Sequence, residues 1–250
     1  MFNLIKPDEN KDEIKLKESK STLLLGDSLE LLKSVNDNSI DLIITDPPYL
    51  LDTHSGGKMY KDKNMQKAFN ELSDSKIDKG YDIITYGKEF IRVMKNINIY
   101  IWCNKIQIPD YLDFYVKELN CKFDILFWNK PNALPTFSNK YLTDMEYCLY
   151  FRNGKCKCFP QSYEDAKTYY SAPINMYDKQ RYLHPTIKPL EMIERMVRNS
   201  SDDGDVVLDT FMGSGTTGVA CKKLNREFIG MEINEDFYKM AKLRIANTKE

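Results

Sequence analysis

The segment DVVLDTFMGSGTTGVACKKLNREFIGMEIN, residues 205–234, decides the fold class. An apolar run ends at Asp209, a glycine-rich turn and a helical stretch follow, and a second apolar run ends at Glu232. This order of strand, turn, helix and strand is typical of parallel α/β sheets. Gly213 and Gly215 have no side chains, so a ligand can approach the backbone of the turn.

The spacing of this segment favours an adenosine-containing ligand. Glu232 follows Gly213 by 19 residues, close to the roughly 20 residues expected for an acid that binds ribose hydroxyls. A Walker loop is excluded, because no Gly-Lys-Ser/Thr follows the glycines. For the glycines taken alone, a tight strand-to-helix turn without a ligand is the alternative.

The alternation of strand and helix continues through most of the chain. Apolar runs predict further strands at 22–27, 40–49, 97–104, 123–130 and 146–151, and helical spacing predicts helices at 28–35, 81–95, 109–120 and 189–200. Residues 53–80 lose this periodicity and carry many lysines, which is typical of a long functional loop.

The domain organisation follows from length and periodicity. A chain of 250 residues has room for one sizeable domain with a full core. Residues 1–20 are mostly polar and predict an N-terminal arm. Residues 21–151 and 183–250 carry the alternating pattern, whereas 152–182 are polar, tyrosine-rich and aperiodic. We interpret 152–182 as an insertion outside the core.

Composition excludes several classes of protein. Hydrophobic residues at 42% and charged residues at 29% are near globular averages. The net charge of −1 gives no general basic field, so a nucleic-acid partner would need a local patch. Cys156-x-Cys158 has no second pair to complete a zinc site, so no metal is expected. No apolar run has the length of a signal peptide or membrane span, which favours a cytoplasmic protein without a membrane partner.

A second motif, IITDPPY at residues 43–49, ends a buried strand. Proline gives no N–H to a sheet, so Pro47 and Pro48 end the strand in a stiff turn. Asp46 and Tyr49 are then held at the carboxyl end of a strand, where open α/β sheets bind ligands. A strand-ending turn with a capping aspartate is the alternative for an isolated match.

Three motifs in this order, DPPY at 46–49, HPTIKP at 184–189 and DTFMGSGTT at 209–217, resemble the beta-class amino-group DNA methyltransferases. The resemblance spans about residues 22 to 246. It implies an α/β, Rossmann-like methyltransferase fold with circularly permuted motifs and a mostly parallel sheet of about seven strands, one of them antiparallel. It also implies S-adenosyl-L-methionine as cofactor and DNA as partner. Family members often dimerise, which makes a homodimer compatible with the resemblance.

The resemblance assigns cofactor contacts to the glycine turn and to other strand ends. It places Asp209 near the methionine end of the cofactor, Phe211 over it, and Asp27 at the edge of the adenine pocket. A helix N-cap is the alternative for Asp27 and for Asp209. The expected cofactor-binding residues are Asp27, Thr186, Lys188, Asp209, Phe211, Gly213, Gly215, Thr216, Thr217 and Glu232.

The expected catalytic residues are Asp46, Pro47, Pro48 and Tyr49. The Asp46 carboxylate and the Pro47 carbonyl could each accept one hydrogen of an exocyclic amine, which frees the nitrogen lone pair for the sulfonium methyl. Tyr49 could stack on a base flipped from the duplex. Trp128 and Lys130, at another strand end, are expected to line the target-base pocket, and a plain core position is the alternative for Trp128.

An aspartate in the first motif position resembles the adenine-specific members, so we expect adenine-N6 methylation. The alternatives are cytosine-N4 methylation, an RNA or protein methyltransferase, and an inert nucleic-acid-binding relative. The segment 152–182 has an excess of three positive charges, which predicts phosphate contacts in a target-recognition region. Solvated surface loops are the alternative for it and for 53–80.

Overall fold

The computed structural model describes residues 14–15, 21–49, 81–133, 141–174 and 187–249. Within these residues a nine-stranded sheet has the order β1-β2-β9-β8-β3-β4-β6-β5-β7. The strands are β1 (Ile14–Lys15), β2 (Ser21–Leu25), β3 (Leu42–Thr45), β4 (Asn98–Cys103), β5 (Lys122–Asn129), β6 (Met145–Arg152), β7 (Tyr169–Ser171), β8 (Val206–Asp209) and β9 (Glu227–Glu232).

The expected sheet is confirmed. Seven strands, from β2 to β5 in the sheet order, are the predicted ones, and among them only β6 runs antiparallel to its neighbours β4 and β5. Two short edge strands were not expected. The two-residue β1 pairs antiparallel with β2, and the three-residue β7 pairs parallel with β5. Strands this short carry no readable alternation of apolar residues, so the sequence pattern did not reveal them.

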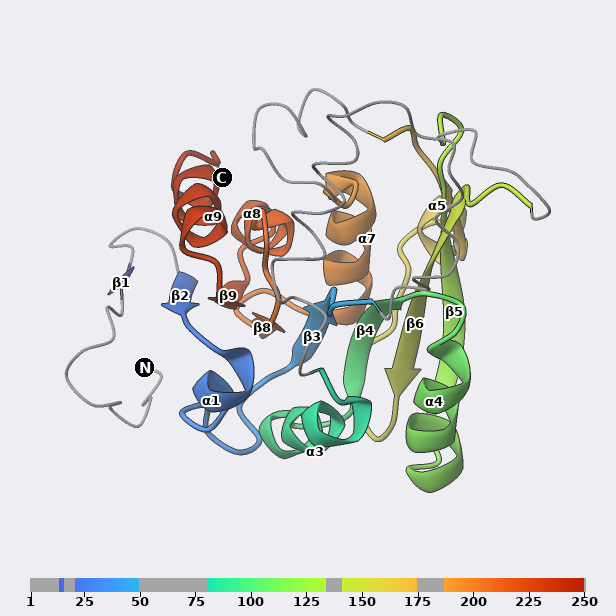
Figure 1. Ribbon diagram of the computed structural model, residues 1–250, viewed down its shortest axis with the longest axis horizontal. Coiled ribbons are helices and arrows are strands. Elements are labelled where there is room, and N and C mark those ends of the chain that lie inside the picture. The colour runs from blue at the N-terminus through green and yellow to red at the C-terminus, as the bar shows by residue number, and fades with distance from the viewer. Residues whose placement is uncertain (1–13, 16–20, 50–80, 134–140, 175–186, 250) are drawn as a thin grey trace, which may run out of the picture.

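Helices cover both faces of the sheet (Figure 1). One face carries α1, α3, α4 and the π-helix η2, and the other carries α7, α8 and α9. The helices are α1 (Ser28–Leu32), α3 (Ile83–Val93), α4 (Ile108–Leu112), η2 (Asp113–Glu118), α5 (Tyr163–Ala166), α7 (Leu190–Ser200), α8 (Thr216–Lys223) and α9 (Glu235–Ala246). The helix expected at 109–120 is therefore α4 continued by a π-helical stretch.

The central strands are buried on both faces because alternate side chains pack in opposite directions. In β3, Ile43 packs with α1 and α3, whereas Leu42 and Ile44 pack with α7. In β4, Tyr100 and Trp102 join that second cluster. None of the helices in the described residues is long and apolar enough to cross a membrane.

The sheet order brings the two sequence motifs together. β8, which comes late in the chain, lies between β9 and the early strand β3. Both neighbours run parallel to β8. The glycine turn after β8 and the DPPY turn after β3 therefore begin at the same edge of the sheet, although 163 residues separate Asp46 from Asp209.

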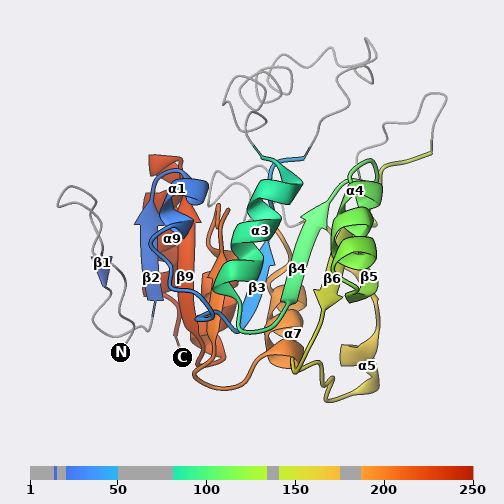
Figure 2. The same ribbon diagram turned by 90° about the horizontal axis from the view of Figure 1, so that it is seen from below.

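The described part of the expected insertion returns along the core. After β6 the chain reaches α5 at the edge of the sheet opposite the carboxyl ends of β2 and β4 (Figure 2). There it packs against the end of α7, where Arg198 pairs with Asp165 at 3.0 Å and Phe159 donates its N–H to Asn199 O. β7 then brings the chain back toward the carboxyl edge beside β5.

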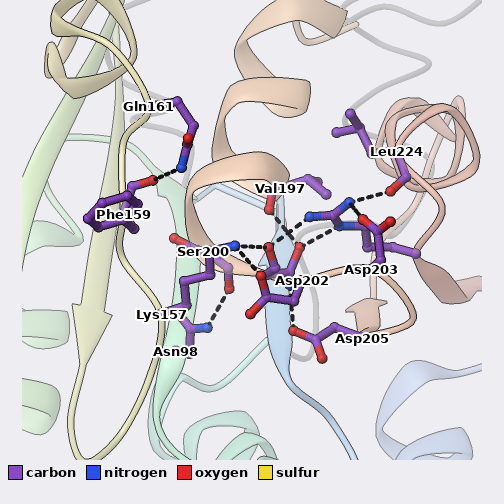
Figure 3. Close-up of polar contacts among 12 residues, drawn as sticks. Asn98, Lys157, Phe159, Gln161, Val197, Ser200, Asp202, Asp203, Asp205 and Leu224 are labelled. Carbon is purple, nitrogen blue, oxygen red and sulfur yellow. Dashed lines mark hydrogen bonds and ion pairs between the residues drawn. The ribbon is translucent and has the colours of Figure 1, made fainter.

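A polar network fastens this passage to the end of α7 (Figure 3). Lys157 donates to Ser201 O at 3.0 Å and pairs with Asp202. The buried Arg226 donates to Ser201 O and, at 2.7 Å, to Asp203. Both side chains thus bind the carbonyl of Ser201, the residue that follows α7. Three of the described basic side chains of the insertion, Arg152, Lys157 and Lys167, are thus ion-paired within the chain.

Candidate active site

The carboxyl edge of the sheet gathers most of the residues singled out in the sequence. Asp27, Asp46, Lys130, Asp209 and Glu232 all lie at or just after the ends of strands that run in the same direction. β6 runs the other way, so it begins at this edge with Met145 and Glu146. Thr186 lies outside the described residues.

The glycine turn is joined to β9 by one carboxylate. Gly213, at φ 47°, donates its N–H to Glu232 Oε2 at 3.0 Å, and Asn234 donates to Oε1 at 2.8 Å. Burial raises the pKa of Glu232. Each carboxylate oxygen retains a second lone pair, so both can still accept a ligand hydroxyl.

Gly215 serves the packing of the turn. It has φ 75°, which suits glycine, and a Cβ there would lie 2.9 Å from the Ala241 Cβ of α9. From the same helix Arg244 donates to Ser214 O and to Thr216 Oγ1, at 3.1 and 2.9 Å. α9 thus fixes the position of the glycine turn.

Asp209 is buried beneath the turn. It accepts the Thr217 hydroxyl at 2.7 Å and the Phe211 N–H at 3.1 Å. Burial raises the pKa of this carboxyl to about 7, against the opposing effect of those two hydrogen bonds. The Thr216 and Thr217 hydroxyls, both expected cofactor contacts, therefore already bind protein groups.

Asp27 caps α1. Its carboxylate accepts the Glu30 N–H at 3.1 Å, which is the alternative left open for this residue. It also lies close to Glu232 along the edge, because Leu25 pairs with Glu232 and Gly26 donates to Glu232 O at 2.9 Å. Asp27, Asp209 and Glu232 make this half of the edge acidic, which suits a ligand with hydroxyls and a positive charge better than a phosphate.

Phe211 belongs to an aromatic cluster beside the turn. Its ring centroid lies 5.6 Å from that of Tyr81 and 5.4 Å from that of Tyr86. Tyr81 accepts a hydrogen bond from the Tyr111 hydroxyl at 2.9 Å, and Tyr86 bonds Ser28 Oγ at the same distance. The position of Phe211 is therefore set by α1, α3 and α4.

On the other half of the edge, Asp46, Tyr49 and Lys188 are linked by hydrogen bonds. Tyr49 donates its hydroxyl to Asp46 Oδ1 at 2.8 Å, and Lys188 donates to Asp46 Oδ2 at 2.5 Å. Burial and the Asp46 and Glu146 carboxylates raise the pKa of Tyr49 well above its usual value. The phenol is therefore neutral, and both carboxylate oxygens of Asp46 keep a lone pair for a further donor.

The ammonium of Lys188 lies at this half of the edge, between the Asp46 and Glu146 carboxylates. The residue is 7% exposed, and Nζ lies 3.2 Å from Glu146 Oε2 and 4.8 Å from the Trp102 ring centroid. Burial lowers the pKa of Lys188, but the Asp46 and Glu146 carboxylates outweigh it and the pKa is raised. A cofactor contact of Lys188, as predicted from the resemblance, stays a prediction.

Trp128 and Lys130 lie at the end of β5. Trp128 is 3% exposed, packs in the core and donates its indole N–H to Ala172 O at 2.9 Å. Trp128 therefore occupies a core position, which was the alternative given for it. Lys130 pairs with Glu146 and lies over the Trp128 ring at 4.9 Å. Their contact with a target base stays a prediction.

Glu146 is the site residue that the sequence interpretation missed. A signal existed, because an acid opens the apolar run EYCLYF where the strand is about to enter the core. Its meaning depends on the direction of β6, which a strand pattern alone does not reveal. Among the described residues no group of three His, Cys, Asp or Glu side chains could hold a metal ion.

Comparison of the sequence with known proteins places the chain in a family. The N6/N4 methyltransferase model, described as DNA methylase, matches residues 40–243. The type II methyltransferase M2.MboI of Moraxella bovis is 30% identical over 235 residues, covering 88% of this chain and 85% of the relative. The M1.HpyAVI–SAM complex has a TM-score of 0.65 at 24% identity, covering 90% of this chain and 99% of that one. The cytosine-N4-specific PvuII DNA methyltransferase has a TM-score of 0.67 at 19% identity, covering 90% and 86%.

Proposed function

The chain belongs to the DNA methylase family of N6 and N4 amino-group methyltransferases, and from that premise we propose that it methylates the N6 of adenine in DNA. The coarser activity is established by family: an S-adenosylmethionine-dependent DNA methyltransferase related to type II modification enzymes. The observation that carries the proposal is the Asp46 carboxylate at the end of β3, held by Tyr49 and Lys188 at the shared edge.

The residues of the acidic half fit the cofactor. S-Adenosylmethionine carries ribose hydroxyls, an ammonium and a sulfonium, and bound to the enzyme it supplies an electrophilic methyl group. The Glu232 carboxylate has lone pairs left for ribose hydroxyls, and the buried Asp209 carboxyl holds the turn through the Thr217 hydroxyl and the Phe211 N–H. We propose that Asp27, Asp209, Phe211, Gly213, Gly215 and Glu232 form the cofactor side, with Thr216 and Thr217 shaping the turn from within.

The residues of the DPPY turn supply the activation of the amine. An exocyclic amine is a poor nucleophile because its lone pair is delocalised into the ring. The Asp46 carboxylate and the Pro47 carbonyl would accept the two amine hydrogens and direct the lone pair toward the methyl. Pro48 stiffens the turn, and Tyr49 both orients Asp46 and presents its ring to the base. This direct transfer requires no covalent intermediate on the enzyme.

The choice of adenine rests on the aspartate in the first motif position. Serine at this position is more usual in cytosine-N4 enzymes, and a carboxylate is the stronger acceptor for an amine hydrogen. The cytosine-N4 enzyme PvuII shares the fold at 19% identity, which concerns the fold alone. Cytosine-N4 transfer is therefore the second candidate, and it would use the same residues.

DNA contacts are proposed for two segments that lie mostly outside the described residues. We propose that the part of the insertion beyond β7, up to residue 182, and residues 53–80 contact DNA. In the first half of the insertion, two lysines already have partners within the chain. Lys157 is ion-paired with Asp202, and Lys167 is ion-paired with Glu164 of α5. Phosphate contacts would then come from Lys179 and Arg181.

The test is to identify the methylated nucleoside. The protein is incubated with duplex DNA and methyl-labelled S-adenosylmethionine, the DNA is digested to nucleosides, and the label is located by mass spectrometry. We expect N6-methyldeoxyadenosine. N4-methyldeoxycytidine would overturn the adenine assignment, and label in RNA or protein but not in DNA would overturn the substrate class.

A further inference from the structure

Glu146 is a buried carboxylate between two lysines at the edge that holds the DPPY turn. Its side chain is 15% exposed, Oε1 pairs with Lys130, and the buried Oε2 lies 3.2 Å from Lys188 Nζ. Burial acts to raise the pKa of Glu146, but the charges of Lys188 and Lys130 outweigh it, and the pKa is lowered. Glu146 is therefore ionised.

Lys188 links Glu146 to the proposed catalytic carboxylate. The same Nζ that faces Glu146 lies 2.5 Å from Asp46 Oδ2 and 3.3 Å from the Tyr49 hydroxyl. The lysine is thus shared by two carboxylates. Two acids and two lysines balance in charge, which is the condition under which ions are tolerated in a protein interior.

The rings around Lys188 restrict where its ammonium can go. Nζ lies 4.8 Å from the Trp102 ring centroid and 5.6 Å from that of Tyr49. Trp102 is buried in β4, the strand next to β3, and Tyr49 closes the DPPY turn that carries Asp46. Within this frame the position of Nζ is set by the two carboxylates.

We propose that Glu146 is a positioning residue for methyl transfer, which holds Lys188 in place and through it orients the Asp46 carboxylate. The inference rests on the proposed function of Asp46. Glu146 does not touch the substrate in this account, because its Oε2 is buried and both of its oxygens face lysines.

Removing the charge of Glu146 would disturb Asp46 in a defined way. Lys188 would then have a single carboxylate partner and would face Lys130 without the charge that separates them. The ammonium would move toward Asp46 and turn its carboxylate away from the amine. A displacement of about 1 Å at a catalytic group costs on the order of 100-fold in rate.

The chain provides a matched control. Glu194 of α7 is also ion-paired with a lysine, Lys223 of α8, and its side chain is 16% exposed against 15% for Glu146. It lies on the α7–α8 contact and takes no part in the site. Lys223 is more exposed than Lys130 and Lys188, but the two carboxylates themselves are equally buried. Glu146→Gln and Glu194→Gln therefore remove the same charge from matched carboxylates, so a loss of activity caused merely by removing a buried, ion-paired carboxylate would appear in both.

Three measurements test the proposal. In single turnover we expect Glu146→Gln to slow transfer about 100-fold, with dissociation constants for DNA and S-adenosylmethionine close to those of the wild type, and Glu194→Gln to stay near wild type. In the Asp46→Asn background, Glu146→Gln should cost little further rate, because it acts through Asp46. In lysine side-chain NMR the Lys188 ammonium signal, identified by its absence in Lys188→Met, should shift in Glu146→Gln and not in Glu194→Gln.

The outcomes separate the two hypotheses. A full-rate Glu146→Gln enzyme, rate losses that add to those of Asp46→Asn, or an unshifted Lys188 signal would each overturn the positioning role. A wild-type enzyme that transfers no methyl to DNA would instead overturn the proposed function, and the NMR result would still decide whether Glu146 holds Lys188. If Glu146→Gln does not fold, Glu146→Asp keeps the charge but shortens the reach, and the same loss of rate is expected.

Discussion

Glu232 accepts the backbone N–H of Gly213 over 3.0 Å, although the two residues are 19 positions apart. The spacing that predicted a ribose-binding acid is therefore also the spacing that closes the glycine turn onto the end of β9. One carboxylate has the lone pairs for both roles, because it binds backbone N–H groups with one lone pair of each oxygen and leaves the others free; the ribose contact stays a prediction.

Glu232→Gln should weaken cofactor binding about 10- to 100-fold, the usual range for losing hydrogen bonds to a charged group. The amide keeps a single acceptor oxygen and so cannot serve Gly213, Asn234 and a ligand together. Calorimetric titration with S-adenosylmethionine measures the change. Glu235→Gln, an exposed acid in the first turn of α9, is the control, and equal affinities for both variants would contradict the assignment.

Asp46→Ala should lower the rate of methyl transfer about 100- to 1000-fold, the range found when one preorganised polar group is removed from a site. The cofactor side lies on β8 and β9 and is not altered, so S-adenosylmethionine should bind as before. Single-turnover transfer to DNA and equilibrium binding are measured together. A variant that transfers methyl at the wild-type rate would remove Asp46 from the mechanism.

The buried Asp209 predicts a pH dependence of stability. Burial raises its pKa to about 7 from a usual value of 3.8, so the folded state holds a proton that the unfolded state releases. The contribution of Asp209 to the free energy of unfolding is fully present below about pH 4 and is lost as the pH rises to about 7. Above that pH the contribution changes no further. The difference of about three units corresponds to at most about 4 kcal/mol.

Asp209→Asn should remove that pH dependence. Without ligand, the variant should be more stable than the wild type at pH 8 and close to it at pH 4.5. Urea unfolding at the two pH values measures the difference. The reverse order, with the variant gaining only at low pH, would show that Asp209 is ionised more easily in the folded protein than outside it.

Much of the fold was predictable because most strands are continuous apolar runs that end in conspicuous turns. Asp46 and Asp209 were singled out for that reason, and both lie at the edge where parallel strands end. The sequence did not reveal β7, because three residues show no periodicity. Residues 235–246, which form α9, follow the last predicted element, and Arg244 of that helix holds the glycine turn.

Side-chain partners in the site were less predictable than its location. Thr217 and Trp128 were expected to contact ligands, which stays a prediction, and the sequence did not reveal that their polar groups bind Asp209 and Ala172. Small hydroxyls and indole N–H groups near a buried turn have protein partners close by, and burial penalises leaving them unpaired. Glu146 was missed because its partners are distant in the sequence. Lys130 precedes it by 16 residues, and Lys188 follows it by 42 residues.

The internal ion pairs of the insertion predict which lysines leave DNA affinity unchanged. Lys157 pairs with Asp202, and Lys167 pairs with Glu164 at 2.6 Å. Replacing either by alanine should leave the slope of log K against log salt unchanged. Arg181→Ala, in the part of the insertion proposed to contact DNA, should reduce the slope by about 0.9, the value for one phosphate contact. Filter binding over a salt series decides, and a reduced slope for Lys157→Ala would place that end of the insertion on DNA.

Replacing a glycine by alanine can cost stability through backbone strain and through steric overlap. Comparison of Gly215 with Gly204 distinguishes these two costs. Both have positive φ, 75° and 80°. A Cβ on Gly204 would meet no atom within 4 Å, whereas a Cβ on Gly215 would lie 2.9 Å from the Ala241 Cβ and 3.1 Å from its Cα. Gly204→Ala should therefore cost only the left-handed backbone, about 1–2 kcal/mol.

Gly215→Ala should cost that amount and a further 1–3 kcal/mol or so for overpacking against α9. The contact atoms include backbone, which cannot swing aside as the end of a flexible side chain does. Urea unfolding of the two variants measures both terms, and their difference is the cost of separating the turn from α9. Equal losses would mean that α9 yields to the added methyl, and the glycine turn would then depend on Arg244 and Glu232 rather than on the close approach of Gly215 to Ala241.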